Sequence, residues 1–421
     1  MRIIILNQFF YPDHSATSQL MTELAESLVE SGHEVTAISG RGLYSGGGKL
    51  PAKQRHEGAA IERAWSTTFG KKSAVGRLAD YLSFYVGATW KLITIRRHDI
   101  VLALTTPPLI SMVALLVARL RGMRMVALIQ DVYPDVAVAL GALSPTSPLT
   151  LLLEWLNRFT LRGADRIIVL GECMRDRILS KAGADAGARI DVIHNWADGE
   201  WLTPLDRRKN PFAIEQDLAG MFVVLFSGNL GRVNDFDTVL DAALLLRDRP
   251  DILFLFIGDG DRAASIKAFA DVHKLGNVRL LPYQPRQMTR YSIAAGDAAL
   301  VTLSQGLAGL SVPSKTYALL AAGRPILFVG DTDSESAAIV ADNECGAVFK
   351  SGESERVASL IAEWSRDKQQ VRLRGQKARS VFERRFDRSL AVSAYLETFT
   401  RCMAGRPRRL LRSVVVTQHQ E

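Results

Sequence analysis

The chain has 421 residues, of which 48% are hydrophobic and 23% are charged, as is ordinary for a globular protein of two or three domains. The formal net charge of +8 suits an anionic partner, whether nucleic acid, nucleotide phosphates or an acidic membrane. Cys173, Cys345 and Cys402 have no metal-binding spacing, which favours a reducing, cytoplasmic setting. The apolar runs are shorter than the roughly 20 residues of a spanning helix, so we expect neither a signal peptide nor a transmembrane segment.

Short apolar runs rich in β-branched residues alternate with helical stretches along the chain. In the first half these runs are 2–7, 34–39, 99–105, 125–130, 166–171 and 190–195. In the second half they are 222–228, 252–258, 278–282, 298–303, 325–329 and 347–350. Most are apolar on both faces, as buried parallel strands are. The alternation therefore predicts βαβ units in two doubly wound α/β sheets.

The polar, proline-containing segment 196–212 separates the two series and indicates a linker. We therefore predict an N-terminal Rossmann-like domain over 1–200 and a C-terminal one over 213–379. A long helix at about 380–405 is expected to pack back on the first domain. Such sheets bind ligands beyond the carboxyl ends of their strands, so two domains facing across a cleft predict two substrates.

The stretch VPSKTYALLAAGRP at 312–325 reads as a buried helix that begins beside an amine. Pro313 suits the first helical position and Gly323 the residue after the end, which places Ser314 and Lys315 in the first turn. A cation is unfavourable there unless an anion lies nearby. A phosphate bound by the turn's amides, the Ser314 hydroxyl and the Lys315 ammonium satisfies that condition. A solvated surface lysine is an equally weighted alternative.

Three more turns follow strands of the second half, in SGNLGRVNDFD, IGDGD and LPYQP. Glycines permit close backbone approach, arginine is a forked phosphate donor, and a carboxylate can accept from a ribose hydroxyl. The candidate donor-binding residues of these turns are Gly228, Asn229, Gly231, Arg232, Asp259, Tyr283 and Gln284. Asp235 suits the cap of the next helix. Each turn alone also reads as an ordinary connection, and together they predict a nucleotide diphosphate pocket.

Two turns of the first half are the candidate acceptor side. The loop NQFFYPDHSATSQL at 7–20 enters a helix through small residues, which leave room for a substrate; its candidate acceptor-binding residues are His14, Ser15, Ala16 and Thr17. The sequence IQDVYPD at 129–135 ends a strand with Gln130 and Asp131. Asp131 is a candidate catalytic group, and a capping aspartate is the alternative. His194 is a second loop histidine.

Segment 69–99 combines basic and aromatic residues, as helices in a bilayer interface do. They are Lys71, Lys72, Arg77, Lys91, Arg96 and Arg97 with Tyr81, Phe84, Tyr85 and Trp90. Anionic headgroups attract each basic residue by about 1 kcal/mol. Peripheral contact with an anionic membrane is therefore predicted, and a helix packed only on the first domain is the alternative. No metal site is predicted.

The motifs QDVYPD, VIHNWAD, FSGNLGR, IGDGD and VPSKTYALLAAGRP together resemble glycosyltransferase family four. More narrowly they resemble its bacterial branch of fucosamine transferases in capsule, O-antigen and colanic-acid-type pathways. The resemblance covers nearly the whole chain and implies the GT-B fold, a hexosyl or N-acetylhexosaminyl donor, preferentially a UDP-sugar, and retention at the anomeric carbon. It implies that the domain over 1–200 binds the acceptor and the domain over 213–379 binds the nucleotide sugar, with no metal or other cofactor and no nucleic-acid partner. The implied acceptor is a polyprenyl-diphosphate-linked or other saccharide in exopolysaccharide synthesis, at the inner face of the plasma membrane.

The sequence departs from this family at four positions. A pair of glutamates that many members carry is matched by Leu310 and Ala318, and a common Arg and Lys are matched by Asn229 and Asn234. Lys315 and Arg232 are then the predicted counter-charges of the leaving diphosphate. Asp131 or Gln130 is expected to orient the sugar, and domain closure to exclude water.

Two other functions remain as alternatives. Loss of both glutamates motivates a non-catalytic GT-B scaffold or partner subunit. A sugar-nucleotide epimerase on the same fold needs acid and base groups around the donor, in which this sequence is poor.

Overall fold

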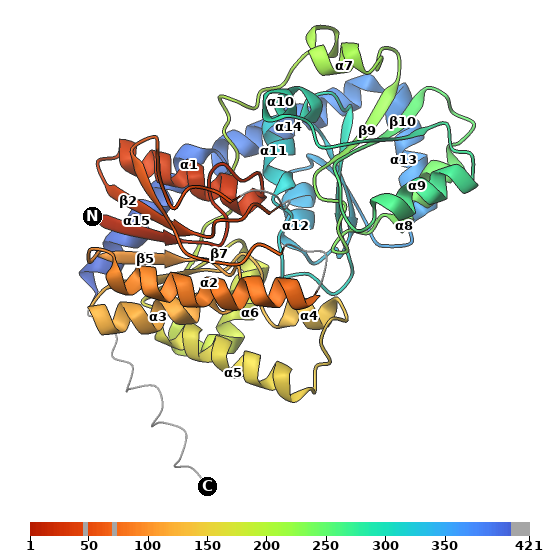
Figure 1. Cartoon of the computed structure of the whole chain (residues 1–421). Coiled ribbons are helices and arrows are strands. Elements are labelled where there is room, and N and C mark those ends of the chain that lie inside the picture. The colour runs from red at the N-terminus through yellow and green to blue at the C-terminus, as the bar shows by residue number, and fades with distance from the viewer. Residues whose placement is uncertain (45–48, 70–73, 406–421) are drawn as a thin grey trace. The chain divides into compact units, whose positions relative to one another are not determined.

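The computed structural model describes residues 1–44, 49–69 and 74–405, and its helices and strands are labelled in Figure 1. The chain divides into two compact units. Unit 1 comprises residues 1–194 and the chain from Val392 onward, and unit 2 comprises residues 195–391. Unit 1 therefore ends before the predicted boundary at residue 200, and segment 196–212 belongs to unit 2.

The described residues of unit 1 form an eight-stranded sheet in the order β3-β4-β2-β1-β5-β6-β7-β8. The strands are β1 Arg2–Leu6, β2 Glu34–Ser39, β3 Lys53–His56, β4 Ala59–Arg63, β5 Ile100–Ala103, β6 Arg124–Leu128, β7 Arg166–Val169 and β8 Ile190–Val192. Only β3 and β4 pair antiparallel among them. The six predicted strands of this half are present.

The hairpin of β3 and β4 was not predicted. Its turn is Glu57–Gly58, where both residues have positive φ, +44° and +80°, as a two-residue hairpin turn requires. Strand β3 is polar and largely exposed, so it lacks the apolar run on which the prediction of the other strands rests.

The helices of unit 1 cover both faces of its sheet. They are α1 Ala16–Glu30, α2 Ala74–Thr94, α3 Ile110–Arg121, α4 Asp135–Ala139, α5 Pro148–Gly163, α6 Glu172–Ala182 and the 3-10 helix η1 Ala184–Arg189. Figure 1 shows α2, α3, α5 and α6 on one face and α1 on the other. Right-handed crossovers dictate this division, because the chain progresses in one direction from β4 to β8 and in the other from β1 to β2.

The sheet of unit 2 has the order β11-β10-β9-β12-β13-β14. Its strands are β9 Phe222–Ser227, β10 Ile252–Ile257, β11 Val278–Leu281, β12 Ala298–Leu303, β13 Ile326–Gly330 and β14 Gly346–Phe349. Side chains alternate between two hydrophobic clusters: Phe222 and Val224 belong to one, and Val223 and Leu225 to the other. The sheet is thus buried on both faces and doubly wound, as predicted.

The helices of unit 2 are η2 Arg207–Lys209, α7 Pro211–Glu215, α8 Asp237–Leu245, α9 Ala263–Val272, α10 Arg286–Ile293, α11 Lys315–Ala321, α12 Glu335–Asp342, α13 Ser354–Arg366 and α14 Lys368–Arg385. Helix α15 (Arg388–Ala404) runs from unit 2 into unit 1. The predicted C-terminal helix is present and belongs to unit 1 from Val392 onward, but it begins at Arg388 and not at about residue 380. The chain breaks at Phe386 and Asp387 because the Phe386 carbonyl accepts from the Ala197 amide at 3.2 Å, and the Arg388 amide donates back to Ala197 at 3.0 Å.

Each sheet has a switch point, where successive crossovers leave in opposite directions. It lies between β1 and β5 in unit 1 and between β9 and β12 in unit 2. Ligands of doubly wound sheets bind at the carboxyl ends of the strands at such points. The turns that follow these strands are therefore the place to look for function. In the part of the chain described, no helix is long and apolar enough to cross a membrane.

Packing of α2 against the segment after β4 leads to a stability prediction. A Cβ added to Gly87 would lie 2.2 Å from the Trp65 carbonyl oxygen. Helix propensity alone predicts that Gly→Ala gains about 1 kcal/mol. We expect Gly87→Ala instead to lose about 1–3 kcal/mol, because the backbone of Trp65 must move.

Urea unfolding measures this change. Gly276→Ala is the control, because a Cβ there has no neighbour within 4 Å. An unfolding midpoint for Gly87→Ala equal to that of the control would contradict the packing described here.

Candidate functional site

The turns after β9 and β10 are held against each other in unit 2. The Gly228 amide donates to the Ile257 carbonyl at 2.9 Å, and the Leu230 amide donates to the Asp259 carbonyl at 2.9 Å. A Cβ at Gly258, whose φ is +144°, would lie 1.9 Å from the Gly228 carbonyl oxygen. This position therefore requires glycine, and the two turns together expose backbone at the switch point.

The turn after β11 joins the same edge. The Tyr283 hydroxyl lies 3.5 Å from the Asp259 carbonyl oxygen, and the Tyr283 side chain is 55% exposed. Asp259 is exposed and accepts from the Gly260 amide. Gln284 donates to the Pro282 carbonyl within its own turn. The structure thus connects the predicted residues of the first two turns with Tyr283, while the Gln284 amide contacts its own turn.

Helix α11 begins two residues later than predicted. Its first residue is Lys315, and Ser314 is the N-cap, with a hydroxyl that makes no capping bond. The Pro313 carbonyl instead accepts from the Thr316 amide at 3.2 Å, as part of a turn before the helix. The predicted end is confirmed, because Gly323 follows the C-cap with φ +63°.

The Lys315 ammonium is directed under the glycine turn. Its Nζ lies 3.4 Å from the centroid of the Phe226 ring and 3.5 Å from Asn234 Oδ1. Although Lys315 keeps some exposed surface, burial lowers the pKa of its ammonium to about 7. Within the described residues no carboxylate forms an ion pair with it. The turn therefore contains a desolvated cationic site without a counter-charge from the protein.

Asn234 supports both the lysine and the turn. Its Nδ2 donates to the carbonyls of Asn229 at 3.2 Å and Gly231 at 3.1 Å, and its Oδ1 accepts from Thr302 at 3.1 Å. The sequence showed Asn234 only as a departure from the family, and its packing role was missed. An asparagine in a loop carries no signal of that role until its partners are known.

A polar pocket of about 240 Å³ lies beside this turn. Its lining residues are Arg232, Asn234, Asp235, Asp237, Arg262, Ser304, Gln305 and Ser351. The Arg232 side chain is 74% exposed, with its Nε 3.4 Å from Asp261. Asp235 accepts from the Thr238 amide at 3.2 Å, so its predicted helix-capping role is confirmed. The pocket thus combines two arginines and two aspartates with neutral hydrogen-bonding groups, a lining suited to a polar ligand.

In unit 1, the turn between β1 and α1 contains buried polar atoms that are not paired. Among the described residues no hydrogen-bond partner is found for Asn7 Oδ1, Gln8 Oε1, Ser15 Oγ or Ser18 Oγ. Buried polar atoms are normally satisfied, so such a group favours a hydroxyl-bearing ligand or water at this turn. Asn7, Gln8 and Ser18 were missed as candidates, although two polar residues directly after an apolar strand were a visible signal.

The predicted acceptor residues lie at the start of α1. Ser15 is its N-cap, and its amide donates to Asp13 at 2.7 Å. His14 and Ala16 are exposed, whereas Thr17 is half-buried. These residues lie at the turn between the first strand and the first helix, as the sequence predicts. Their contact with a substrate stays a prediction.

The turns after β1, β5 and β6 are joined by hydrogen bonds. The Gln8 amide donates to the Thr106 carbonyl at 3.0 Å. Thr105 Oγ1 accepts from the amides of Gln130 at 3.3 Å and Asp131 at 3.4 Å. Asp131 is half-buried at the end of β6. The two candidate regions of unit 1 thus share one edge of the sheet. Farther along this edge, His194 Nδ1 lies 2.9 Å from the Leu170 carbonyl oxygen.

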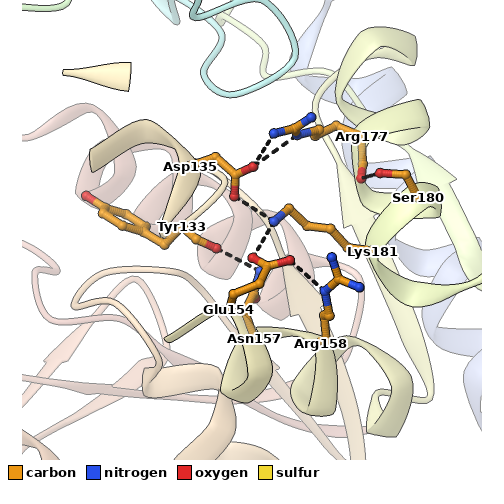
Figure 2. Close-up of polar contacts among 8 residues, drawn as sticks. All are labelled: Tyr133, Asp135, Glu154, Asn157, Arg158, Arg177, Ser180 and Lys181. Carbon is orange, nitrogen blue, oxygen red and sulfur yellow. Dashed lines mark hydrogen bonds and ion pairs between the residues drawn. The ribbon is translucent and has the colours of Figure 1, made fainter. Parts of the chain in front are cut away.

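An ionic network lies behind the β6 turn, where Figure 2 shows Lys181 between Asp135 and Glu154. The Lys181 side chain is 6% exposed and its Nζ lies 2.7 Å from Asp135 Oδ2. Burial alone raises the pKa of Asp135, but Lys181 and Arg177 outweigh it and hold that pKa below its usual value. Asn157 donates to the Tyr133 carbonyl at 2.7 Å. Helices α5 and α6 thereby position the turn that carries Asp131.

No group of three or more residues able to hold a metal ion occurs among the residues described. Lys71 and Lys72 of the predicted membrane segment lie outside the described residues.

Family profiles match both halves of the chain. The profile of the glycosyl transferase 4-like domain matches residues 16–196, and that of glycosyl transferases group 1 matches residues 211–381. A probable glycosyltransferase from Pseudomonas aeruginosa, WbjE, is 34% identical over 64% of this chain, and the chain spans just under two thirds of it, 66%. The putative colanic acid biosynthesis glycosyl transferase WcaI of Escherichia coli K12 is 25% identical, over 80% of this chain and 84% of the relative.

Two solved structures illustrate the fold that this chain shares with known proteins. Sucrose-phosphate synthase from Thermosynechococcus elongatus superimposes with a TM-score of 0.78 at 12% identity, covering 96% of this chain and 99% of the other. HepE from Anabaena, solved in complex with UDP and glucose, superimposes with a TM-score of 0.72 at 15% identity, covering 95% and 100%. These matches identify the fold of the chain, with its two α/β units, as GT-B.

The ionic network leads to a second stability prediction. Lys181→Met leaves Asp135 and Glu154 without their shared cation. We expect a loss of about 3 kcal/mol, the lower end for a broken buried pair, because Arg177 and Arg158 remain.

Lys267→Met is the matched control, because Lys267 pairs with Asp271 on an exposed helix surface, and such pairs contribute about 1 kcal/mol or less. Chemical denaturation of both variants compares them. Equal losses would show that the Lys181 network contributes no more than a surface pair.

Proposed function

We propose that this chain, which belongs to the glycosyltransferases described by the two matched profiles, transfers a sugar from a UDP-sugar to a saccharide on a lipid diphosphate, with retention. The single observation that carries the donor part is the Lys315 ammonium, buried under the glycine turn with no carboxylate paired to it among the described residues. A buried cation without a counter-charge is unfavourable by itself and binds an anion strongly.

The geometry of unit 2 supports a nucleoside diphosphate as that anion. A Cβ added at Gly228 would lie 3.6 Å from Lys315 Nζ, so the backbone of this turn is close to the ammonium, and Arg232 lines the adjoining pocket. Asp259 is exposed next to this turn and suits a ribose hydroxyl. The structural relative HepE was solved in complex with UDP and glucose, which supports uracil as the base.

The proposed reaction breaks the bond between the sugar's anomeric carbon and the β-phosphate oxygen. That oxygen keeps the electron pair, and the diphosphate leaves. The acceptor hydroxyl forms the new bond on the same face of the sugar, and its proton passes to the leaving diphosphate. Lys315 and Arg232 stabilise the charge that develops on the diphosphate. Asp131, or Gln130 beside it, orients the sugar.

The unpaired atoms of the β1–α1 turn support unit 1 as the acceptor side. Asn7 Oδ1 and Gln8 Oε1 are acceptors for sugar hydroxyls, and the hydroxyls of Ser15 and Ser18 both donate and accept. His14, Ala16 and Thr17 border the same turn. Exopolysaccharide synthesis at the inner face of the plasma membrane is the proposed setting. The polysaccharide part is supported by the name of one curated relative, a putative colanic acid biosynthesis glycosyl transferase. Metal-independent transfer is part of the proposal and is checked by assay with a chelator.

The donor pocket is tested by nucleotide binding. UDP, GDP, ADP and CMP are added to wild type and to Lys315→Met, and the thermal midpoint is measured. A ligand at 100 times its Kd stabilises by about 2.7 kcal/mol, a shift of several degrees. We expect UDP to raise the midpoint of wild type, and Lys315→Met to weaken binding by about 2 kcal/mol or more, roughly thirtyfold in Kd.

Lys267→Met serves as the control for loss of a lysine outside the site. No shift with any nucleotide would favour the non-catalytic scaffold, and equal UDP binding by Lys315→Met would remove Lys315 from the donor site.

The lowered pKa of Lys315 gives the donor affinity a pH dependence. Below about pH 7, Lys315 of the ligand-free protein is already protonated, so its titration does not change the affinity for UDP. Above it the free lysine is neutral, whereas a bound diphosphate raises the pKa, so binding takes up a proton. The affinity for UDP is then expected to fall about tenfold per unit between about pH 7 and 9.

Isothermal titration across that range measures the slope and, in buffers of different ionisation enthalpy, the protons taken up. Lys315→Met is expected to bind weakly with no slope. A flat profile for wild type would contradict the assignment of a neutral lysine above pH 7.

A further inference from the structure

One face of unit 1 is unusually apolar for a surface. More than half of the exposed large hydrophobic side chains that the structure describes lie on α2, α3 and α5. These three helices cover the same face of the sheet, as Figure 1 shows, and their outer sides therefore point away from it together. Single exposed apolar residues are ordinary, but a contiguous group marks an interaction surface.

Helix α2 contributes a continuous stripe. Its exposed hydrophobic residues are Val75, Leu78, Leu82, Val86, Trp90 and Ile93. Their spacing of three or four residues places them on one side of the helix, while Phe84, Ala88 and Leu92 on the other side are buried in unit 1. The helix is thus apolar on both sides, and only one of them has a partner in unit 1.

Helices α3 and α5 extend this stripe. Leu116 and Leu120 of α3 are exposed, Leu120 to 81%. On α5, Leu151, Leu152 and Trp155 are exposed, and Trp155 stacks on Phe159 with ring centroids 6.1 Å apart. The sequence indicated only α2, because periodicity does not tell which of two apolar sides is buried.

The charged residues of these helices indicate the kind of surface that the apolar face binds. Their exposed charged residues, Arg77, Arg158 and Arg162, are all basic, and those on α5 follow Leu151 and Trp155 at helical spacing. The two acidic residues of the three helices are half-buried and already paired: Asp80 accepts from Thr67, and Glu154 pairs with Lys181 and with Arg158. Apolar side chains with tryptophan and a basic border fit the interface of an anionic bilayer.

We propose that α2, α3 and α5 form a lipid-docking face that inserts into the headgroup region of an anionic membrane. This rests on the proposed function, because it deepens the assignment of a lipid-linked acceptor. It also gives α5 two roles, since the opposite side of that helix holds the β6 turn through Asn157 and Glu154. Docking and the candidate acceptor edge thus share one helix.

Vesicle binding tests the docking face. The full chain is floated with vesicles of phosphatidylethanolamine and phosphatidylglycerol, or of phosphatidylcholine alone. Each leucine that inserts strengthens binding about tenfold, and each arginine near anionic headgroups about fivefold. We expect wild type to bind the anionic vesicles at least tenfold more tightly than the neutral ones. Leu82→Glu and Leu152→Glu are each expected to weaken binding at least tenfold.

Leu245→Glu is the matched control, because Leu245 lies on α8 in unit 2 and is as exposed as Leu82, 56% against 55%. Circular dichroism and the thermal midpoint establish that the variants fold, and sedimentation velocity without lipid gives the oligomeric state. Unchanged binding by Leu245→Glu supports the docking face.

Three outcomes overturn the proposal: wild type binds neither vesicle, Leu245→Glu loses as much binding as the α2 and α5 variants, or wild type is a dimer that those variants make monomeric, without vesicle binding. The last result assigns the face to a second copy of the chain.

UDP binding is measured in the same variants and separates this proposal from the proposed function. A failed docking face leaves UDP binding intact, whereas a failed donor site leaves vesicle binding intact.

Discussion

A desolvated ammonium under a turn of glycines is the interaction on which the functional account depends. Lys315 contacts an aromatic ring and one amide oxygen, and among the described residues no carboxylate pairs with it. A lysine in that position loses hydration without gaining a counter-ion, and the lowered pKa is the physical consequence. An anion beside the ammonium supplies the missing counter-charge, so the proposed donor diphosphate favours the charged lysine.

The fold explains how the lysine reaches that position. Strands β9 and β10 approach so closely that Gly258 has no room for a Cβ, and their turns bond to each other. Asn234, on the same turn, contacts Lys315, Thr302 and two carbonyls of the glycine turn. Asn234 is a buried, uncharged amide, and Lys315, Arg232 and Arg262 are cations near this turn. Unit 1 differs in chemistry. Among its described residues, the turn between β1 and α1 contains buried polar atoms without a hydrogen-bond partner, and the outer sides of α2, α3 and α5 are apolar with exposed arginines.

The sequence was most informative where local pattern and burial coincide. All twelve predicted strands are present because apolar runs bounded by turns are specific to buried parallel strands. The polar hairpin β3–β4 lacked that signal, and the break at Phe386 depends on pairing with Ala197, distant in sequence. The glycine turns and Lys315 could be identified from residue types and their spacing alone. The partners Phe226 and Asn234, the Lys181 network and the exposed side of α2 depend on tertiary contacts, which no local pattern encodes.

Nuclear magnetic resonance of protein with ¹³C-labelled lysine tests the central claim most directly. The Cε resonance of Lys315, assigned by its loss in Lys315→Met, is followed through a pH titration with and without UDP. The account predicts a midpoint near pH 7 in the free protein, the value set by burial, and a midpoint at higher pH in the UDP complex. An ordinary lysine midpoint of about 10.4 in both states would contradict it.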